Sequence, residues 1–436
     1  MKNSGVEWIG EIPEDWEVKR GKELFFEIND RCKNPEKYPL LSVSEYYGVA
    51  PKSEKIDEGD FITHAETLDG YKICQKGDIV QNIMLAWKRA TGMSNYEGLI
   101  SPAYCIYRPY KGIDSKYYHY LFRTDVYADL FKQYSTGIID SRLRLYPAKF
   151  LSLKYAYPPK ETQQCIASYL DKKCSKIEET IQNQQQVIEK LKAYKQSLIT
   201  EAVTGKVKIE NGKICGKYES YKESGVEYLG KIPSNWNIKR LRYIGKCQNG
   251  ISKGGEFFGS GYPFVSYGDV YNNLTLPETV SGLIESTPEE QENYSVMAGD
   301  IFFTRTSETI EEVGFTSVCL KTIEKATFAG FVIRVRPFTE ELVPDYSKYY
   351  FSSDAHRRFF VKEMNLVTRA SLSQDLLKRL PVLIPSKDEQ KEIADYLDKK
   401  CTAIDTAIEQ KQNLIEKLTE YKKSLIYECV TGKREI

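Results

Sequence analysis

The sequence predicts an α+β protein in which two globular modules in tandem are each followed by a long helix. Three observations support this prediction: a block near the start of the chain recurs in the second half, a later block recurs near the end, and each copy of that later block has the spacing of a long amphipathic helix. Short β-like runs separated by Gly, Pro and Asn fill the modules, without the βαβ alternation of a doubly wound sheet. We therefore expect a pseudo-twofold internal repeat.

The two recurring blocks define a frame that both halves of the chain share. Ser4–Pro13 returns as Ser224–Pro233, and the match extends to Trp16, which corresponds to Trp236. Ile166–Cys174 returns as Ile393–Cys401. Similarity of this length does not arise by chance, so the chain is a tandem duplication.

The interiors of the two halves, residues 21–157 and 241–384, are mostly unlike each other. A few landmarks recur inside them: Gly77-Asp78-Ile79 as Gly299-Asp300-Ile301, Arg108-Pro109 as Arg336-Pro337, and Lys116-Tyr117-Tyr118 as Lys348-Tyr349-Tyr350. A shared frame around divergent interiors predicts two modules of one type with two different specificities.

The second block of each half predicts a helix, because residues 161–202 contain neither Pro nor Gly and apolar residues recur at heptad spacing. The predicted pairing residues are Leu170, Ile177, Ile181, Ile188, Leu191 and Leu198 in the first helix, and Leu397, Ile404, Ile408, Ile415, Leu418 and Leu425 in the second. Polar residues interrupt both rows at equivalent positions, Gln184 with Lys411 and Lys195 with Lys422. We expect an antiparallel coiled coil that ends at Gly205 and Gly432. The alternative is two separate surface helices, each packed on its own module.

The predicted boundaries follow from this pattern. They are a first module over residues 1–160, a helix over 161–206, a linker over 207–222, a second module over 223–386, and a helix with a C-terminal tail over 387–436.

Composition excludes several classes of function. The net charge is +1, which excludes a polybasic binder, and no stretch approaches the ~20 apolar residues of a membrane span. Three histidines and ten cysteines without a Cys-x-x-Cys pattern favour neither a metal site nor a disulfide framework. No nucleotide-binding glycine motif or Asn-Pro-Pro-aromatic methylation motif is present. We therefore expect a cytoplasmic, non-catalytic chain without a metal or a cofactor of its own.

Basic loops are the candidates for contact with DNA, because Arg presents two parallel donors to guanine and Lys or Arg binds phosphate. In the first module the candidates are Arg142 and Arg144 near its end, and Lys88 and Arg89 after Gly-Asp-Ile. In the second module they are Arg369 and Ser371 near its end, and Arg305 and Thr306 after Gly-Asp-Ile. Lys253, in a glycine-rich loop of the second module, is a further candidate. The alternative for each loop is an ordinary solvated charge. Most of the 32 tyrosines are expected to be half-buried strand residues.

The first block, the Gly-Asp-Ile landmark and the Ile-Ala-x-Tyr-Leu-Asp run on a long helix together resemble the specificity subunit of type I restriction-modification systems. The resemblance covers nearly the whole chain and occurs twice. It departs at Glu161-Thr162-Gln163-Gln164, where members usually have a Glu-Gln pair, as Glu389-Gln390 keeps in the second half.

The resemblance implies that each interior is a target recognition domain and each helix a spacer. It implies as partners double-stranded DNA, two methyltransferase subunits and restriction subunits. The cofactors would lie on those partners, with S-adenosylmethionine on the methyltransferase and ATP and Mg on the restriction subunit. The target would be an asymmetric, bipartite DNA sequence. A standalone DNA-binding or coiled-coil scaffold protein remains as an alternative, and a cryptic enzyme as a more distant one.

Overall fold

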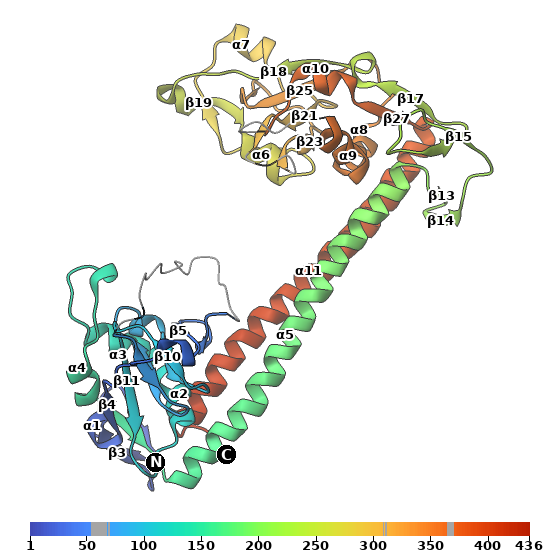
Figure 1. Cartoon of the computed structure of the whole chain (residues 1–436). Helices are drawn as coiled ribbons and strands as arrows, with labels where there is room; N and C mark the ends of the chain where they lie inside the picture. The colour runs from blue at the N-terminus through green and yellow to red at the C-terminus, as the bar shows by residue number, and fades with distance from the viewer. Residues whose placement is uncertain (54–67, 69, 308, 310–311, 364–369) are drawn as a thin grey trace. The chain divides into compact units, whose positions relative to one another are not determined.

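The computed structural model describes residues 1–53, 68, 70–307, 309, 312–363 and 370–436 (Figure 1). The chain divides into two compact units. Unit 1 consists of residues 1–184 and 412–436, and unit 2 of residues 185–411. Each unit therefore contains one globular module, part of the helix that follows this module, and part of the other long helix. The mixture of helices and sheets confirms the predicted α+β class.

Unit 1 is organised around an antiparallel sheet with the strand order β4-β11-β8-β9. These strands are β4 (Phe25–Ile28), β11 (Tyr104–Pro109), β8 (Ile79–Asn82) and β9 (Thr91–Met93). Strand pairs flank this sheet: β1 (Lys2–Asn3) with β2 (Glu11–Ile12), β3 (Glu17–Arg20) with β12 (Lys154–Tyr157), β5 (Leu41–Ser44) with β6 (Gly48–Pro51), and β7 (Lys72–Cys74) with β10 (Gly98–Ile100). The helices are α1 (Gly21–Leu24), α2 (Ser115–Phe122), α3 (Asp125–Gln133) and α4 (Pro147–Ser152), with 3-10 turns η1 (Pro35–Lys37), η2 (Ala86–Lys88) and η3 (Asp140–Arg142).

Unit 2 repeats this sheet with the order β18-β25-β21-β23, formed by β18 (Gly245–Asn249), β25 (Val332–Pro337), β21 (Ile301–Thr304) and β23 (Thr316–Val318). It also repeats two strand pairs of unit 1 as β15 (Tyr221–Glu223) with β16 (Lys231–Pro233), and β17 (Asn237–Arg240) with β27 (Pro381–Ile384). Its own additions are β13 (Lys208–Glu210) with β14 (Lys213–Gly216), the sheet of β19 (Phe258–Val265), β20 (Leu283–Ile284) and β24 (Thr327–Phe328), and β22 (Thr306–Ser307) with β26 (Ala370–Ser371). The helices are α6 (Tyr267–Asn272), α7 (Pro288–Asn293), α8 (Pro344–Ser352), α9 (Asp354–Glu363) and α10 (Gln374–Arg379), with η4 (Leu241–Tyr243) and η5 (Gly255–Phe257). The four-stranded sheet thus recurs inside the two interiors, although their sequences are mostly unlike.

The long helices are α5 (Lys160–Val203) and α11 (Lys387–Val430), and they pair within each unit. In unit 1, Lys422 forms an ion pair with Glu178, and Cys429 lies near Cys174. Higher numbers on α11 therefore face lower numbers on α5, which confirms the antiparallel direction.

The twelve predicted pairing residues are all buried or half-buried. Leu170, Ile177, Ile188, Leu198, Leu397, Ile404, Ile415 and Leu425 are at most 8% exposed, and Ile181, Leu191, Ile408 and Leu418 are half-buried. The polar interruptions at Lys195 and Lys422 have a specific use. The Lys195 Nζ lies 2.6 Å from Asp405 in unit 2, as Lys422 lies against Glu178 in unit 1. Each lysine thus forms an ion pair with the opposite helix, the kind of contact by which a polar residue on such a seam favours one register.

The glycines that end the long helices are also where the two repeated blocks meet. Gly205 adopts a left-handed φ of 71°, and the amide of Lys206 donates to the Glu201 carbonyl at 3.0 Å, as a helix C-cap requires. A Cβ on Gly205 would lie 2.4 Å from the Pro233 ring and 3.3 Å from the Trp236 ring. Gly432 repeats this contact in unit 1 against Pro13 and Trp16. The end of α5 therefore packs on the module that precedes α11, and the end of α11 packs on the module that precedes α5.

The segment predicted as a linker, residues 207–222, contains the β13–β14 hairpin. Its turn residues Asn211 and Gly212 have φ values of 52° and 71°. Positive φ at both central residues is the type I′ geometry that Asn-Gly favours between two strands. The Asn-Gly pair thus explains why this segment, predicted as a linker, contains a hairpin.

Candidate nucleic-acid interface

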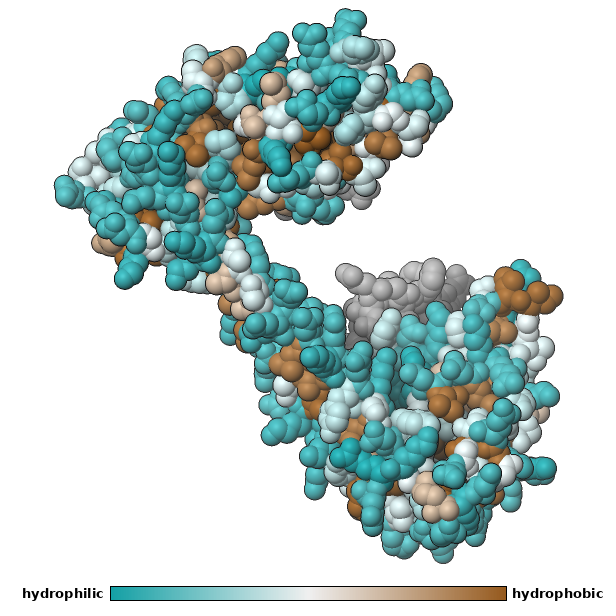
Figure 2. Space-filling view, turned by 180° about the vertical axis from the view of Figure 1, so that it is seen from behind, coloured by the Kyte–Doolittle hydropathy of each residue, from teal (hydrophilic) through white to brown (hydrophobic). Residues whose placement is uncertain are grey.

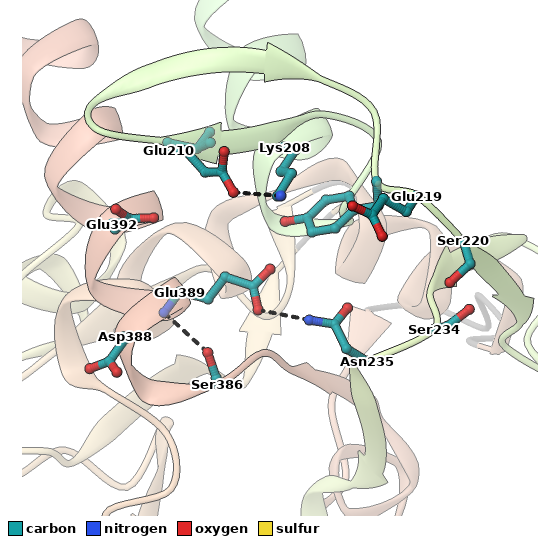
Figure 3. Close-up of a pocket in the computed structure, with 12 residues that line it drawn as sticks. Lys208, Glu210, Glu219, Ser220, Ser234, Asn235, Ser386, Asp388, Glu389 and Glu392 are labelled. Carbon is teal, nitrogen blue, oxygen red and sulfur yellow. Dashed lines mark hydrogen bonds and ion pairs between the residues drawn. The ribbon is translucent and has the colours of Figure 1, made fainter.

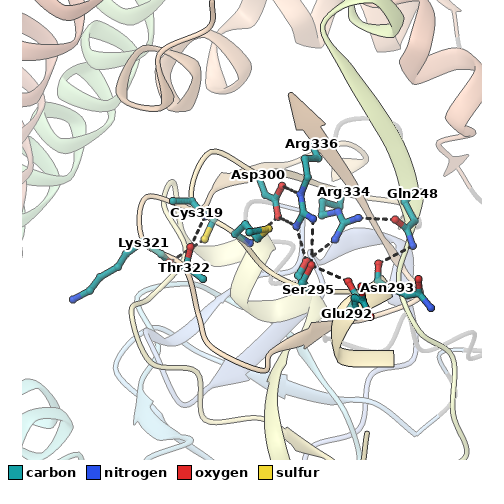
Figure 4. Close-up of polar contacts among 12 residues, drawn as sticks. Gln248, Glu292, Asn293, Ser295, Asp300, Cys319, Lys321, Thr322, Arg334 and Arg336 are labelled. Atoms are coloured by element: carbon teal, nitrogen blue, oxygen red, sulfur yellow. Dashed lines mark hydrogen bonds and ion pairs between the residues drawn. The ribbon is translucent and has the colours of Figure 1, made fainter. Parts of the chain in front are cut away.

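Each module contains an ion pair with a buried carboxylate. Arg108 donates to both carboxylate oxygens of Asp78 at 2.9 and 3.0 Å, and Arg336 donates to those of Asp300 at 2.7 and 2.6 Å. Figure 4 shows the pair in unit 2, together with Ser295, whose backbone carbonyl also accepts from Arg336. The two carboxylates are nearly inaccessible, at 2% and 1% exposed. The recurring landmarks of the sequence are therefore the two ends of one structural contact in each unit.

In unit 1 the structure brings two of the predicted loops together. Leu145 directly follows Arg144, is fully buried, and donates its amide to the carbonyl of Ile83 at 2.9 Å. Ile83 lies on the loop that carries Lys88 and Arg89. The loop after β8 and the loop before α4 therefore form one surface.

The basic residues on this surface differ in how strongly they are engaged. Arg142 and Lys88 are exposed. Arg144 folds back on its own loop and donates to the carbonyl of Leu143 at 2.8 Å, while Arg89 forms an ion pair with Asp125. Arg142 and Lys88 are therefore the members of this set with the most freedom to bind phosphate or a base edge.

Unit 2 joins the corresponding loops in the same way. Leu372 occupies the position in the second repeat that Leu145 occupies in the first, is also fully buried, and donates its amide to the Arg305 carbonyl at 2.7 Å. Thr306 on β22 and Ser371 on β26 are direct partners in an antiparallel pair. Three of the predicted residues, Arg305, Thr306 and Ser371, thus meet at one edge. Arg369 lies outside the residues that the structure describes.

Lys253 has a different environment from the other candidates. Its Nζ lies 2.6 Å from Glu290 and 2.7 Å from the carbonyl of Glu285, and its side chain is only 15% exposed. The hydrogen bond from Lys253 lowers the pKa of Glu290, so the carboxylate stays charged beside the ammonium group. Lys253 therefore anchors the glycine-rich loop, and its ammonium group is less available to a DNA phosphate than the exposed guanidinium group of Arg142.

Aromatic residues near the edge of unit 2 were missed by the sequence analysis. Phe331 is 64% exposed, and its carbonyl accepts from the Arg305 amide at 2.9 Å. Tyr267 donates its hydroxyl to the Thr306 carbonyl at 3.0 Å and stacks on Tyr271. Local sequence gave no sign of this, because residues 267, 305 and 331 meet only after the sheet has formed.

Tyrosines beside lysine are buried on helices here, and not half-buried on strands as the sequence predicted. Tyr117 is fully buried and donates its hydroxyl to the carbonyl of Val430 at 2.8 Å. The equivalent contact in unit 2 is made by Tyr346, which donates to Val203 at 3.2 Å. The repeated Lys-Tyr-Tyr motif predicts Tyr349 as the equivalent of Tyr117, but the hydrogen bond identifies Tyr346, three residues before Tyr349. Because three residues are close to one helical turn, Tyr346 and Tyr349 lie on similar faces of α8.

A pocket of about 730 Å³ in unit 2 has the wrong charge for DNA. It lies between the β13–β14 hairpin and the start of α11 (Figure 3). Its acidic residues are Glu210, Glu219, Asp388, Glu389 and Glu392, and its one basic side chain, Lys208, is paired with Glu210 at 2.5 Å. Carboxylates repel phosphate, so this pocket is not a candidate for contact with DNA.

Comparisons with known proteins show which proteins this chain is similar to. Residues 233–418 match the model of the type I restriction modification DNA specificity domain. The chain is 24% identical over 340 residues to the type I restriction enzyme EcoKI specificity subunit of Escherichia coli strain K12, covering 76% of this chain and 68% of that one. It is 24% identical over 441 residues to the MjaVIII specificity subunit of Methanocaldococcus jannaschii, covering 97% and 93%.

Solved structures show the same fold. A chain from a study of complex assembly and conformational transition of the type I R-M system has a TM-score of 0.71 at 13% identity, covering 97% of this chain and 100% of that one. The HsdS subunit from Thermoanaerobacter tengcongensis has a TM-score of 0.55 at 14% identity, covering 97% and 98%. The resemblance predicted from sequence is confirmed: the chain is similar to type I restriction enzyme specificity subunits, and its residues 233–418 match the model of their DNA specificity domain.

Proposed function

We propose that the chain recognises an asymmetric, bipartite sequence in double-stranded DNA, with one half-site read by each module. The observation that carries the proposal is the pair of loops joined at Leu145 in unit 1 and at Leu372 in unit 2. The hydrogen bond that joins the two loops is the same in both units, but the polar residues on the loops differ. They are Lys88 and Arg142 in unit 1, and Arg305, Thr306 and Ser371 in unit 2. Equivalent scaffolds with unlike contact residues suit the reading of two unlike half-sites.

The chain in this proposal supplies specificity, and its partners supply the chemistry. It positions two adenine methyltransferase subunits, which bind S-adenosylmethionine, and restriction subunits, which use ATP and Mg. The names of the relatives support this assignment, since each is the specificity subunit of a type I restriction enzyme. Phosphate binding would be shared with those subunits, which fits a chain whose own net charge is only +1.

The long helices set the gap between the half-sites in this proposal. Each has 44 residues, about 66 Å at 1.5 Å per residue, and each contributes to both units. A longer helix pair would therefore lengthen the gap.

The test is a matched insertion. Because the helices are antiparallel, one extra turn is needed in both: the same four residues after Gln184 and after Lys411, which occupy equivalent positions in the two repeats. The added ~6 Å corresponds to one or two base pairs at ~3.4 Å each. We expect methylated sites with unchanged half-sites and a gap longer by that amount. Active protein with an unchanged gap would contradict the proposal that the helices set it.

A further inference from the structure

The loop between α3 and α4 in unit 1 is a short, closed ribbon with an apolar tip. Thr136 and Arg144 form an antiparallel bridge with hydrogen bonds of 2.9 and 3.0 Å, and the turn η3 closes the far end. In Figure 1 this segment projects from the rest of the unit between α3 and α4. At the tip, Ile138 is 100% exposed and Ile139 is 52% exposed.

This tip is held in place without being buried. A Cβ on Gly137 would lie 2.6 Å from the Arg142 carbonyl, so the two sides of the ribbon are in close contact there. Lys132 on α3 forms an ion pair of 2.8 Å with Asp140, which ties the tip to the helix. The ribbon therefore presents its isoleucines from an ordered backbone, unlike an apolar residue on a loose end.

The surroundings of the tip are basic. Between residues 132 and 149 the basic residues are Lys132, Arg142, Arg144 and Lys149, and the acidic one is Asp140. Since Asp140 already pairs with Lys132, the remaining three cations are not neutralised by acidic residues of this segment. Figure 2 shows hydrophobic atoms at the end of a projection of unit 1, within a largely hydrophilic surface. The cations complement the phosphates that line the grooves of duplex DNA, and the apolar tip complements the apolar groups on the groove floor.

The shape of the ribbon selects between the grooves. The major groove is about 12 Å wide and admits a two-stranded ribbon, whereas the minor groove is about 6 Å wide. The apolar group on the floor of the major groove is the C5-methyl group of thymine. We infer that Ile138 is a specificity-determining residue that contacts a thymine methyl in the half-site read by unit 1, with Arg142 and Arg144 on the flanking backbone. This inference rests on the proposed function, because it requires unit 1 to read a half-site.

The test uses the full chain, a pool of randomised duplexes, and the variants Ile138→Ser and Ile214→Ser. Ile214 lies on the β13–β14 hairpin of unit 2 and is 44% exposed, so it controls for the loss of an exposed isoleucine elsewhere. We expect Ile138→Ser to lose preference for thymine at one position of one half-site, by about ten-fold. The salt dependence of binding should not change, because the side chain carries no charge. Ile214→Ser should select the same sequences as the wild type.

A second measurement checks the contact directly. Replacing the selected thymine by uracil removes only the methyl group, so it should weaken binding of the wild type and leave Ile138→Ser unchanged. Equal weakening of both proteins, or a selected half-site without thymine, would overturn the inference. A wild type that selects no bipartite sequence at all would instead contradict the proposed function.

Discussion

Arg336 holds the buried carboxylate of Asp300 through two hydrogen bonds, from Nε at 2.7 Å and from Nη2 at 2.6 Å. Asp300 also accepts from the Met297 amide at 2.8 Å, so the carboxylate fixes the turn before β21 as well as the strand β25. Unit 1 makes the same contact with Arg108, Asp78 and the amide of Gln75. This contact joins the strands from which the candidate DNA loops emerge.

Arg336→Ala should destabilise unit 2 by about 3 kcal/mol, because it leaves the Asp300 charge buried without its partner. Pulse-labelling hydrogen exchange in urea, followed for peptides of each unit separately, measures the change. Lys321→Ala is the matched control, since its ion pair with Glu278 has both side chains about 70% exposed and is worth at most about 1 kcal/mol. Equal effects of the two substitutions would contradict a structural role for the buried pair.

Gly205→Ala should cost unit 2 more stability than Gly225→Ala, although both glycines have the same left-handed backbone. Their φ values are 71° and 72°, so both substitutions carry a strain of about 1–2 kcal/mol. Only at Gly205 would the new methyl group meet the Pro233 ring, which adds about 1–3 kcal/mol of overpacking. Urea midpoints of the two variants give the comparison. Identical midpoints would show that the helix end does not pack on Pro233.

Arg142→Ala and Arg305→Ala should each impair one half-site and leave the other intact. If the side chain contacts a base, the expected loss is about 1–3 kcal/mol at one position. Competition binding with duplexes altered in either half-site measures this selectivity. Arg89→Ala is the control, because Asp125 already engages its guanidinium group. Loss of affinity at both half-sites would assign Arg142 or Arg305 a structural role instead.

The stability of unit 2 should fall as the pH drops below about 6.5. His356 is 2% exposed and surrounded by Phe303, Phe351 and Phe360, and burial lowers its pKa to about 3, with a further contribution from Arg357. Between these two pH values the unfolded chain binds a proton at His356 that the folded chain does not, so each proton taken up favours unfolding.

At pH 5 this linkage amounts to about 2 kcal/mol relative to pH 7. His356→Gln should remove that part of the pH dependence, as measured by urea unfolding of both proteins at pH 7 and pH 5. The comparison cancels the contribution of carboxylates, which titrate in both proteins. Equal pH dependence of the two proteins would mean that His356 titrates normally in the folded state.

The frame of this protein could be predicted from sequence because it is duplicated. The repeat located the helices, their caps at Gly205 and Gly432, and the Gly-Asp-Ile and Arg-Pro landmarks. It did not show that Asp78 and Arg108 form one contact, because residues 30 apart are joined only by strand pairing. Short matches also misled: the Lys-Tyr-Tyr motif aligned Tyr117 with Tyr349, whereas the hydrogen bond to the helix end makes Tyr346 its equivalent.

The residues predicted to contact DNA stay predictions, but the structure shows where their loops lie. The loop of Arg142, near the end of the first module, joins the loop after β8, and the loop of Arg305 joins the segment before α10 in unit 2. The pairing of Lys253 with Glu290 could not be predicted, since the two residues are 37 positions apart and nothing local indicates it. Phe331 and Ile138 were missed for a similar reason. Sequence alone does not distinguish an exposed apolar residue from a buried one when both lie between β-like runs.

The most direct test of the whole account is a methylation map. The chain would be expressed with a type I methyltransferase subunit from the same genome in a host that lacks adenine methylation, and the host DNA read by single-molecule sequencing. The account predicts one asymmetric motif of two unlike half-sites, a fixed gap of unspecified bases, and methyladenine in both halves. A single uninterrupted motif, or a soluble complex that binds DNA without methylating it, would contradict the account.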